Sequence, residues 1–369
     1  MQRTAILDDL EKIMNIDRSD MLSFCVNAPE HYGNAAELAK KMKIDYPRPQ
    51  GIIVAGMGGS SIGGELLKDW CRERASVPIE ICRDYQLPSF ANKNTLVFAV
   101  SYSGETEETL SCLLDAIRKK CMTLCISSGG TLREIAQKLS FPNLLVPVGM
   151  APRATLPYLF MPMPSILEKL GLVSDVSIQY SETIRILREI STENSPEQPL
   201  KNNFSKSLAS NLLGTVPAIY GFGLYRAVAQ RLKTQFNENS KNLAKWEFFP
   251  ELDHNEIVGW EVAQEFAKFF SVIFIRDAAE SIEIRSRIEA TKELIEQDKL
   301  RFYEIWSKGN SDIAKMVSLI CTGDFTSVYL ALLRRVDPTP VKAIAVLKDQ
   351  LKRTGIREKI IRELHKITK

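Results

Sequence analysis

The sequence predicts an α/β protein of two similar domains, each a mainly parallel sheet flanked by helices on both faces. Three observations predict this fold. Apolar strands alternate with helical segments, a strand–turn–helix unit recurs in the second half of the chain, and 369 residues suffice for two domains of ordinary size. We place the first domain at residues 1–165 and the second, with a C-terminal helix, at residues 166–369.

The first domain begins with helical sequence and continues as alternating strands and helices. Two helices are expected before the proline-containing stretch at 46–49, which breaks the helical pattern; they cover residues 3–25 and 29–43. Short apolar runs then predict strands at 51–56, 78–82, 95–100, 122–126 and 143–147. The segments between them predict helices at 61–74, 106–119 and 131–139. Continuously apolar strands of this kind are typical of a parallel sheet that is covered on both faces.

The second domain follows a stretch at 148–164 that is punctuated by prolines. Helical sequence covers residues 163–213, with a polar loop at 192–199, and residues 216–223 predict a strand that runs into a turn. Further strands are expected at 270–276 and 301–306, and further helices at 224–239, 261–268, 281–296, 311–333 and 341–352.

Composition and charge exclude several classes of protein. The 48 basic and 45 acidic residues leave a formal net charge of +3, so there is no general attraction to nucleic acid. No apolar run reaches the roughly 18 residues of a membrane span, and the acidic start of the chain does not fit a secretory signal. Seven cysteines form no CxxC pair, and three histidines are too few for a histidine-rich metal site. We therefore expect a cytoplasmic protein with reduced thiols, no metal, and no membrane or nucleic-acid partner.

Two glycine- and serine-rich loops carry the clearest chemical signal. The first, at 56–64, and the second, at 101–106, each follow an apolar strand and precede a helix. Free backbone N–H groups and the helix dipole favour a phosphate at such a helix N-terminus. In a parallel sheet both loops lie at the carboxyl ends of the strands, where ligands bind. We predict a phosphate site formed by Gly58, Gly59, Ser60, Ser101, Ser103 and Thr106.

Other interpretations of these loops fit less well. The spacing Gly56-x-Gly58-x-x-Ser61 approaches the dinucleotide-binding fingerprint, but serines stand where a pyrophosphate loop needs bare backbone. No Gly-Lys-Ser/Thr follows, which excludes a Walker loop. Helix capping by serine or threonine explains one such loop, but two at one sheet edge favour binding. We expect no bound cofactor.

Together the loops resemble the sugar isomerase (SIS) domain, in which Ser/Thr-rich loops hold the phosphate of a phosphosugar. The sequences at 235–241 and 249–256 resemble the second-domain signature of the bifunctional phosphoglucose/phosphomannose isomerases, and the segments 323–330 and 336–341 match as well. The resemblance spans nearly the whole chain. It implies two SIS domains and a metal-free aldose–ketose isomerase that interconverts glucose 6-phosphate, mannose 6-phosphate and fructose 6-phosphate.

This chemistry and the resemblance together give four side chains a role. Moving a carbonyl between C1 and C2 needs a base that takes a proton from one carbon and returns it to the other, which suits the carboxylate of Glu238. The polar neighbours of His254 are expected to orient it for proton exchange with the ring oxygen. The resemblance implies that Arg153 stabilises the enediolate, that Lys348 assists ring opening, and that His254 reaches the active site of the neighbouring subunit in a homodimer.

The predictions of substrate specificity and of turnover rest on the resemblance more than on single residues. The family contains a threonine that permits epimer tolerance, and Thr339 lies in the corresponding region. A phosphosugar-binding SIS regulator remains an alternative, although it would need a basic helix-turn-helix segment. So does a degenerate isomerase without turnover. An amidotransferase-type SIS protein would need an N-terminal cysteine nucleophile, whereas this chain begins with Met1, Gln2 and Arg3.

Overall fold

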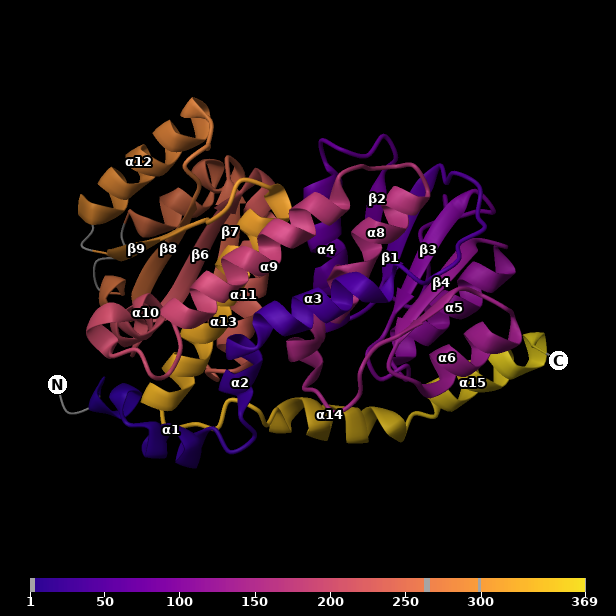
Figure 1. The fold of residues 1–369 in the computed structure, drawn as a ribbon, viewed down its shortest axis with the longest axis horizontal. Helices are drawn as coiled ribbons and strands as arrows, with labels where there is room; N and C mark the ends of the chain where they lie inside the picture. The colour runs from indigo at the N-terminus through magenta and orange to yellow at the C-terminus, as the bar shows by residue number, and fades with distance from the viewer. Residues whose placement is uncertain (1–3, 262–265, 298–299, 369) are drawn as a thin grey trace. The chain divides into compact units, whose positions relative to one another are not determined.

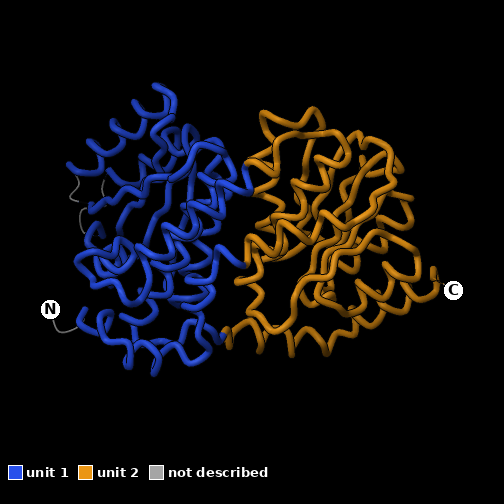
Figure 2. The backbone as a smooth tube through the Cα atoms, in the orientation of Figure 1, with its two compact units in different colours: residues 1–30, 179–340 blue, residues 31–178, 341–369 orange. Residues whose placement is uncertain are grey.

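The computed structural model describes residues 4–261, 266–297 and 300–368. The chain divides into two compact units: unit 1 comprises residues 1–30 and 179–340, and unit 2 comprises residues 31–178 and 341–369 (Figure 2). Each unit is built on one sheet of parallel strands with helices packed against it (Figure 1). The predicted α/β fold with two parallel sheets is therefore confirmed. The division into units is interleaved along the chain, whereas the sequence analysis placed one boundary, at residue 165.

The sheet of unit 2 has the strand order β2-β1-β3-β4-β5, with every neighbouring pair parallel. Its strands are β1 (Gly51–Ala55), β2 (Ile79–Cys82), β3 (Thr95–Val100), β4 (Met122–Ser127) and β5 (Asn143–Leu145). In the register of the sheet, Ala55 pairs with Cys82 on one side and with Ala99 on the other, and Ala99 pairs with Cys125. The loops after β1, β3 and β4 therefore start at the same edge of the sheet.

Helices cover both faces of this sheet. On one face, α5, α6 and α15 enclose a core that includes Ala99, Leu113, Leu132 and Leu364. On the other face, α4 packs against β1 and β2, with Gly64 against the side chain of Val54. The helices of unit 2 are α4 (Gly59–Cys71), α5 (Glu107–Arg118), α6 (Gly130–Lys138), α7 (Leu156–Phe160), α8 (Pro162–Lys169), α14 (Lys342–Lys352) and α15 (Ile356–Ile367), with a 3-10 turn η2 (Pro152–Thr155); α3 (Ala28–Leu38) begins in unit 1 and continues into unit 2.

The sheet of unit 1 has the order β7-β6-β8-β9, again with every neighbouring pair parallel. Its strands are β6 (Val216–Phe222), β7 (Lys245–Phe249), β8 (Phe270–Arg276) and β9 (Arg301–Trp306). Its helices are α1 (Leu10–Ile16), α2 (Met21–Val26), α9 (Val176–Glu193, which begins in unit 2), α10 (Phe204–Leu212), α11 (Arg226–Glu238), α12 (Ile282–Gln297) and α13 (Asp312–Leu333). Short 3-10 turns complete the unit: η1 (Thr4–Asp8), η3 (Leu200–Asn202), η4 (Gly223–Tyr225), η5 (Glu251–His254), η6 (Glu256–Trp260) and η8 (Ala267–Phe269).

Helix α13 is the central helix of unit 1. Within the described chain it alone is long and apolar enough to cross a membrane, but 89% of its apolar window is buried inside the protein. It packs against α2, α10 and α11. Its apolar character is therefore that of a core helix.

Several expected elements differ from those in the structure. The helix expected over 3–25 is divided into η1, α1 and α2, because the Asp17 carboxylate accepts the N–H groups of Met21 and Leu22 and starts a new helix. The long helical stretch after residue 163 is likewise divided into α8, α9 and α10. Strand β7 and helix α15 were not expected at all. The helix expected at 261–268 falls largely on 262–265, which lie outside the described residues.

Helix α11 and helix α13 approach each other at Gly323. A Cβ atom at this position would lie 2.6 Å from Cγ of Leu232, a fully buried side chain. Alanine favours a helix over glycine by about 1 kcal/mol, so helix propensity alone would make Gly323→Ala stabilising. We expect the steric clash with Leu232 to outweigh this gain in helix propensity.

We expect Gly323→Ala to lower the free energy of unfolding by about 1–3 kcal/mol in urea denaturation. The double variant Gly323→Ala/Leu232→Ala is the control, because truncating Leu232 makes room for the new methyl group. Its loss should be smaller than the sum of the two single losses. A Gly323→Ala variant that is more stable than the wild type would contradict this description of the helix contact.

Candidate active site

The first loop turns sharply at Gly58 and leads directly into α4. Gly58 has a φ of +53°, and α4 begins at the next residue. Ser60 is buried in the first helical turn, whereas Ser61 donates its hydroxyl to the backbone oxygen of Gly58 at 3.0 Å. In the described part of the chain, neither α4 nor α5 has a cap from the side chain of its N-cap residue. Both helix N-termini are thus suited to an anion from outside the loops.

The second loop is organised by the hydroxyl of Ser101. This oxygen accepts the backbone N–H of Gly104 at 3.1 Å and that of Thr106 at 3.4 Å, and it lies 2.8 Å from the Thr106 hydroxyl. Ser101 is fully buried, whereas Ser103 is exposed and Thr106 half-buried. Ser101 therefore orders the loop, and Ser103 and Thr106 present accessible hydroxyl groups.

A third loop, at 127–131, is bonded to the second loop and was not predicted from the sequence. Its Ser128 donates a backbone N–H and a hydroxyl to the backbone oxygen of Tyr102, at 2.8 and 2.6 Å. Glu105 accepts the backbone N–H of Thr131 at 2.7 Å and its hydroxyl at 3.0 Å, and so occupies the N-terminus of α6. The Ser-Ser-Gly-Gly-Thr sequence after an apolar strand was the available signal.

Arg153 lies in the turn η2 against the first loop. A Cβ atom at Gly59 would lie 3.1 Å from the backbone oxygen of Pro152 and 3.5 Å from Cα of Arg153. Arg153 itself is only 2% exposed. Glycine at position 59 thus allows the backbone of the loop to approach the arginine. The six predicted phosphate-site residues and Arg153 therefore all belong to unit 2, in its first two loops and in η2.

Glu238 is the last residue of α11 in unit 1 and is half-buried. The residues that follow it are tied to α13: the Asn239 amide donates to the Ser327 hydroxyl at 2.9 Å, and the Ser240 hydroxyl donates to the Ser327 backbone oxygen at 2.6 Å. Lys241 donates to the backbone oxygens of Glu238 and Pro338, both at 2.7 Å. The sequence motifs at 235–241, 323–330 and 336–341 are therefore in contact.

His254 ends the turn η5 of unit 1 and is exposed. The carboxylate of Asp253 is bonded to Arg287 at 2.8 Å and to Thr291 at 3.2 Å, both on α12. The Asn255 amide donates to Glu251 at 2.8 Å. Both flanking side chains thus bond to groups other than His254 in the described residues, and their orienting role stays a prediction.

Lys348 lies on α14 of unit 2, a helix whose residues are all exposed. Thr339 is held in its turn by a hydrogen bond from its backbone N–H to Asp337 at 2.9 Å.

The carboxyl edge of the sheet in unit 1, which corresponds to the loop-bearing edge in unit 2, carries charged groups. Tyr225 donates its hydroxyl to Asp277, and Lys315 pairs with the same carboxylate at 3.1 Å. Burial alone would raise the pKa of Asp277, but hydrogen bonds from Tyr225 and Ala279 and the Lys315 ammonium lower it. A carboxylate that stays ionised disfavours a phosphate at this edge.

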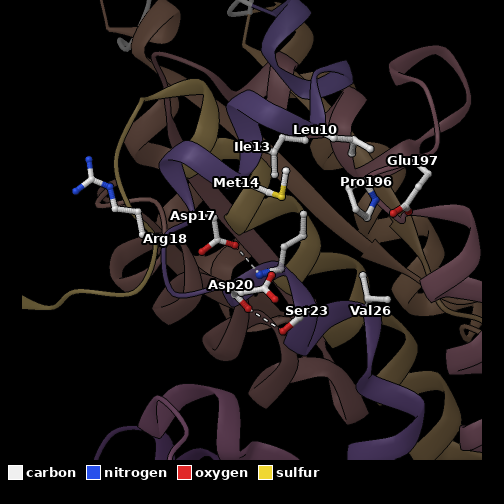
Figure 3. Close-up of a pocket in the computed structure, with 11 residues that line it drawn as sticks. Leu10, Ile13, Met14, Asp17, Arg18, Asp20, Ser23, Val26, Pro196 and Glu197 are labelled. Atoms are coloured by element: carbon white, nitrogen blue, oxygen red, sulfur yellow. Dashed lines mark hydrogen bonds between the residues drawn. The ribbon is translucent and has the colours of Figure 1, made fainter.

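A separate groove of about 500 Å³ lies in unit 1 between α1, α2 and the loop at Pro196 and Glu197 (Figure 3). Its lining is mainly apolar, with Leu10, Ile13 and Met14 on α1. The Asp17 carboxylate at this groove is engaged in starting α2. The groove contains none of the predicted site residues.

Comparison with known proteins finds relatives over most of the chain. Residues 201–351 match the family model of the bacterial phospho-glucose isomerase C-terminal SIS domain. A bifunctional phosphoglucose/phosphomannose isomerase of Caldicellulosiruptor bescii is 39% identical over 334 residues, which cover 90% of this chain and 98% of the relative. One from Aquifex aeolicus is 34% identical over 82% of this chain and 91% of its own length.

A solved structure, of a hypothetical protein from Thermus thermophilus, superposes with a TM-score of 0.73 at 16% identity and covers 96% of this chain and 95% of its own. This likeness concerns the fold alone. The sequence identity to the two isomerases extends over most of the chain and therefore through both units. The chain belongs to the family of bifunctional phosphoglucose/phosphomannose isomerases.

Proposed function

We propose that this protein interconverts glucose 6-phosphate and mannose 6-phosphate with fructose 6-phosphate through a cis-enediolate intermediate. The observation that carries the proposal is the edge of the unit 2 sheet, where two helices without side-chain caps and accessible loop hydroxyls converge. The names of the relatives support the choice of substrates.

The loops of unit 2 bind the phosphate group. The hydroxyls of Ser103 and Thr106 donate to phosphate oxygens, together with Ser60 and the backbone N–H groups of Gly58 and Gly59. Ser101 contributes by holding the loop in this conformation, because its oxygen already accepts two backbone N–H groups. Because these bonds order the second loop before substrate arrives, little ordering of this loop is required on binding.

Glu238 transfers the proton between C1 and C2. Its carboxylate removes the proton beside the carbonyl, the enediolate forms, and the same carboxylic acid returns the proton to the adjacent carbon. Arg153 supplies a fixed positive charge to the oxygen on which negative charge develops. The guanidinium is buried, so its interaction with that charge is weakly screened by water.

His254 and Lys348 open the sugar ring by exchanging protons with the ring oxygen. Both side chains are exposed in the single chain. In the proposed homodimer, His254 completes the active site of the neighbouring subunit, and Thr339 belongs to the region that tolerates both epimers at C2. The reaction needs no metal ion.

The direct test is to incubate the purified protein with fructose 6-phosphate and EDTA and to quantify the hexose phosphates formed. We expect both glucose 6-phosphate and mannose 6-phosphate. Glucose 6-phosphate alone would retain the isomerase mechanism and remove the epimer tolerance. Saturable binding of fructose 6-phosphate with neither product would replace the proposal by the phosphosugar-binding regulator or the degenerate isomerase.

Replacing the catalytic base tests the mechanism. Glu238→Gln keeps the shape of the side chain but removes the base, so kcat should fall by about a thousandfold or more while fructose 6-phosphate still binds. Glu283→Gln, on the exposed start of α12 in the same unit, is the matched control and should retain full turnover. Normal kcat in Glu238→Gln would remove this residue from the mechanism.

Mixing two inactive variants tests the shared active site. Purified Glu238→Gln and His254→Gln, each nearly inactive alone, should recover about a quarter of wild-type activity when their subunits exchange, because half of the dimers are hybrids and each hybrid has one intact site. Mixing after each variant has been cross-linked should give no recovery. Absence of recovery after proven subunit exchange would place Glu238 and His254 of one chain in the same site.

A further inference from the structure

Tyr102, in the middle of the second loop, is bonded to three neighbouring segments. Its backbone N–H donates to the Ser60 hydroxyl of the first loop at 3.3 Å, and its backbone oxygen accepts from Ser128 of the third loop. Its phenol oxygen accepts the backbone N–H of Met150 at 2.9 Å. The backbone of Tyr102 therefore connects the loops to one another, whereas its side chain reaches the segment that leads to Arg153.

Met150 lies three residues before Arg153, at the start of a locally ordered turn. Pro152 fixes its own φ angle, and the Thr155 hydroxyl donates to the Pro152 backbone oxygen at 2.7 Å, which closes the turn around Arg153. Since the turn is ordered internally, holding the N–H of Met150 restricts the direction from which the turn approaches the loops. The phenol of Tyr102 is the side chain that holds it.

We propose that Tyr102 is a positioning residue that couples the phosphate-binding loops to Arg153. This inference rests on the proposed function, in which Arg153 stabilises the enediolate. The Ser101 hydroxyl holds residues 101–106 in one conformation, and the Tyr102 phenol extends this order to the turn around Arg153 through Met150. Correct positioning of Arg153 stabilises the transition state, because the fixed cation then faces the developing negative charge. A small displacement of the guanidinium would weaken this stabilisation.

The competing interpretation is that the phenol touches the sugar directly. Its hydrogen atom is available for donation, since the bond to Met150 uses only a lone pair. A direct contact would act independently of Arg153. The two interpretations therefore differ in what happens when both residues are changed together.

The first variant is Tyr102→Phe, which removes only the phenol oxygen. We expect kcat to fall about tenfold, with the KM for fructose 6-phosphate and the inhibition constant for inorganic phosphate both within about twofold of the wild type. Tyr46→Phe is the matched control: it removes a half-buried phenol of the same unit that donates to the Thr123 backbone oxygen at 2.8 Å, and it should leave kcat unchanged. A higher KM with unchanged kcat would overturn the proposal, because the phenol would then serve ground-state binding.

The second step repeats Tyr102→Phe in an Arg153→Lys background. If Tyr102 acts through Arg153, the further loss of kcat should be less than about twofold, as expected for coupled residues. A full tenfold loss in both backgrounds would assign the phenol a separate role and overturn the proposal. Thermal melting of each variant checks that the protein is folded. An inactive wild-type protein would overturn the proposed function itself, and this inference with it, whereas additive losses in an active enzyme would overturn the inference alone.

Discussion

The candidate phosphate site depends on the close approach of two backbone segments at Gly104 and Gly129. A Cβ atom at Gly104 would lie 1.9 Å from the Gly129 backbone oxygen, and Gly104 has a φ of +70°, so the position requires glycine on both grounds. This approach brings the Glu105 carboxylate to the first turn of α6, where it accepts from Thr131. The Glu105 carboxylate thereby occupies the N-terminus of α6, so that α4 and α5 remain the candidate phosphate-binding helices among those described at this edge.

The two sheets share parallel strands but offer opposite electrostatics at their carboxyl edges. In unit 2, the edge carries hydroxyls, backbone N–H groups and the buried cation of Arg153. In unit 1, the ionised carboxylate of Asp277 takes the corresponding place and is satisfied by Tyr225 and Lys315. The unit 2 edge thus offers donors and a cation to a phosphate, whereas the Asp277 carboxylate disfavours a phosphate at the unit 1 edge. Similar topology therefore does not by itself provide two equivalent binding sites.

The sequence was most informative where a single local pattern determines the structure. Apolar runs and glycine-rich turns predicted eight of the nine strands in the described residues, and the two principal loops. Strand β7 was missed because Lys245 and Glu247 interrupt the apolar pattern of a short edge strand. Helix α15 was missed although its apolar residues recur at helical spacing. Its packing of Leu364 into the core beneath α5 and α6 of unit 2 is a long-range contact that periodicity cannot reveal. The engagement of Asp253 with α12 was hidden for the same reason.

In the second loop and at the end of α11, the groups that fix the geometry of the candidate site are different from the groups proposed to react. In the second loop, the buried Ser101 hydroxyl accepts backbone N–H groups, so Ser103 remains exposed with its hydroxyl hydrogen available to a ligand. After α11, Asn239 and Ser240 carry the bonds to α13, while the Glu238 side chain is only half-buried. Anchoring through neighbours fixes the backbone of a functional residue without requiring its own side chain to serve as the anchor. A site arranged in this way reorganises little as charge develops, which is the condition that proton transfer through an enediolate imposes.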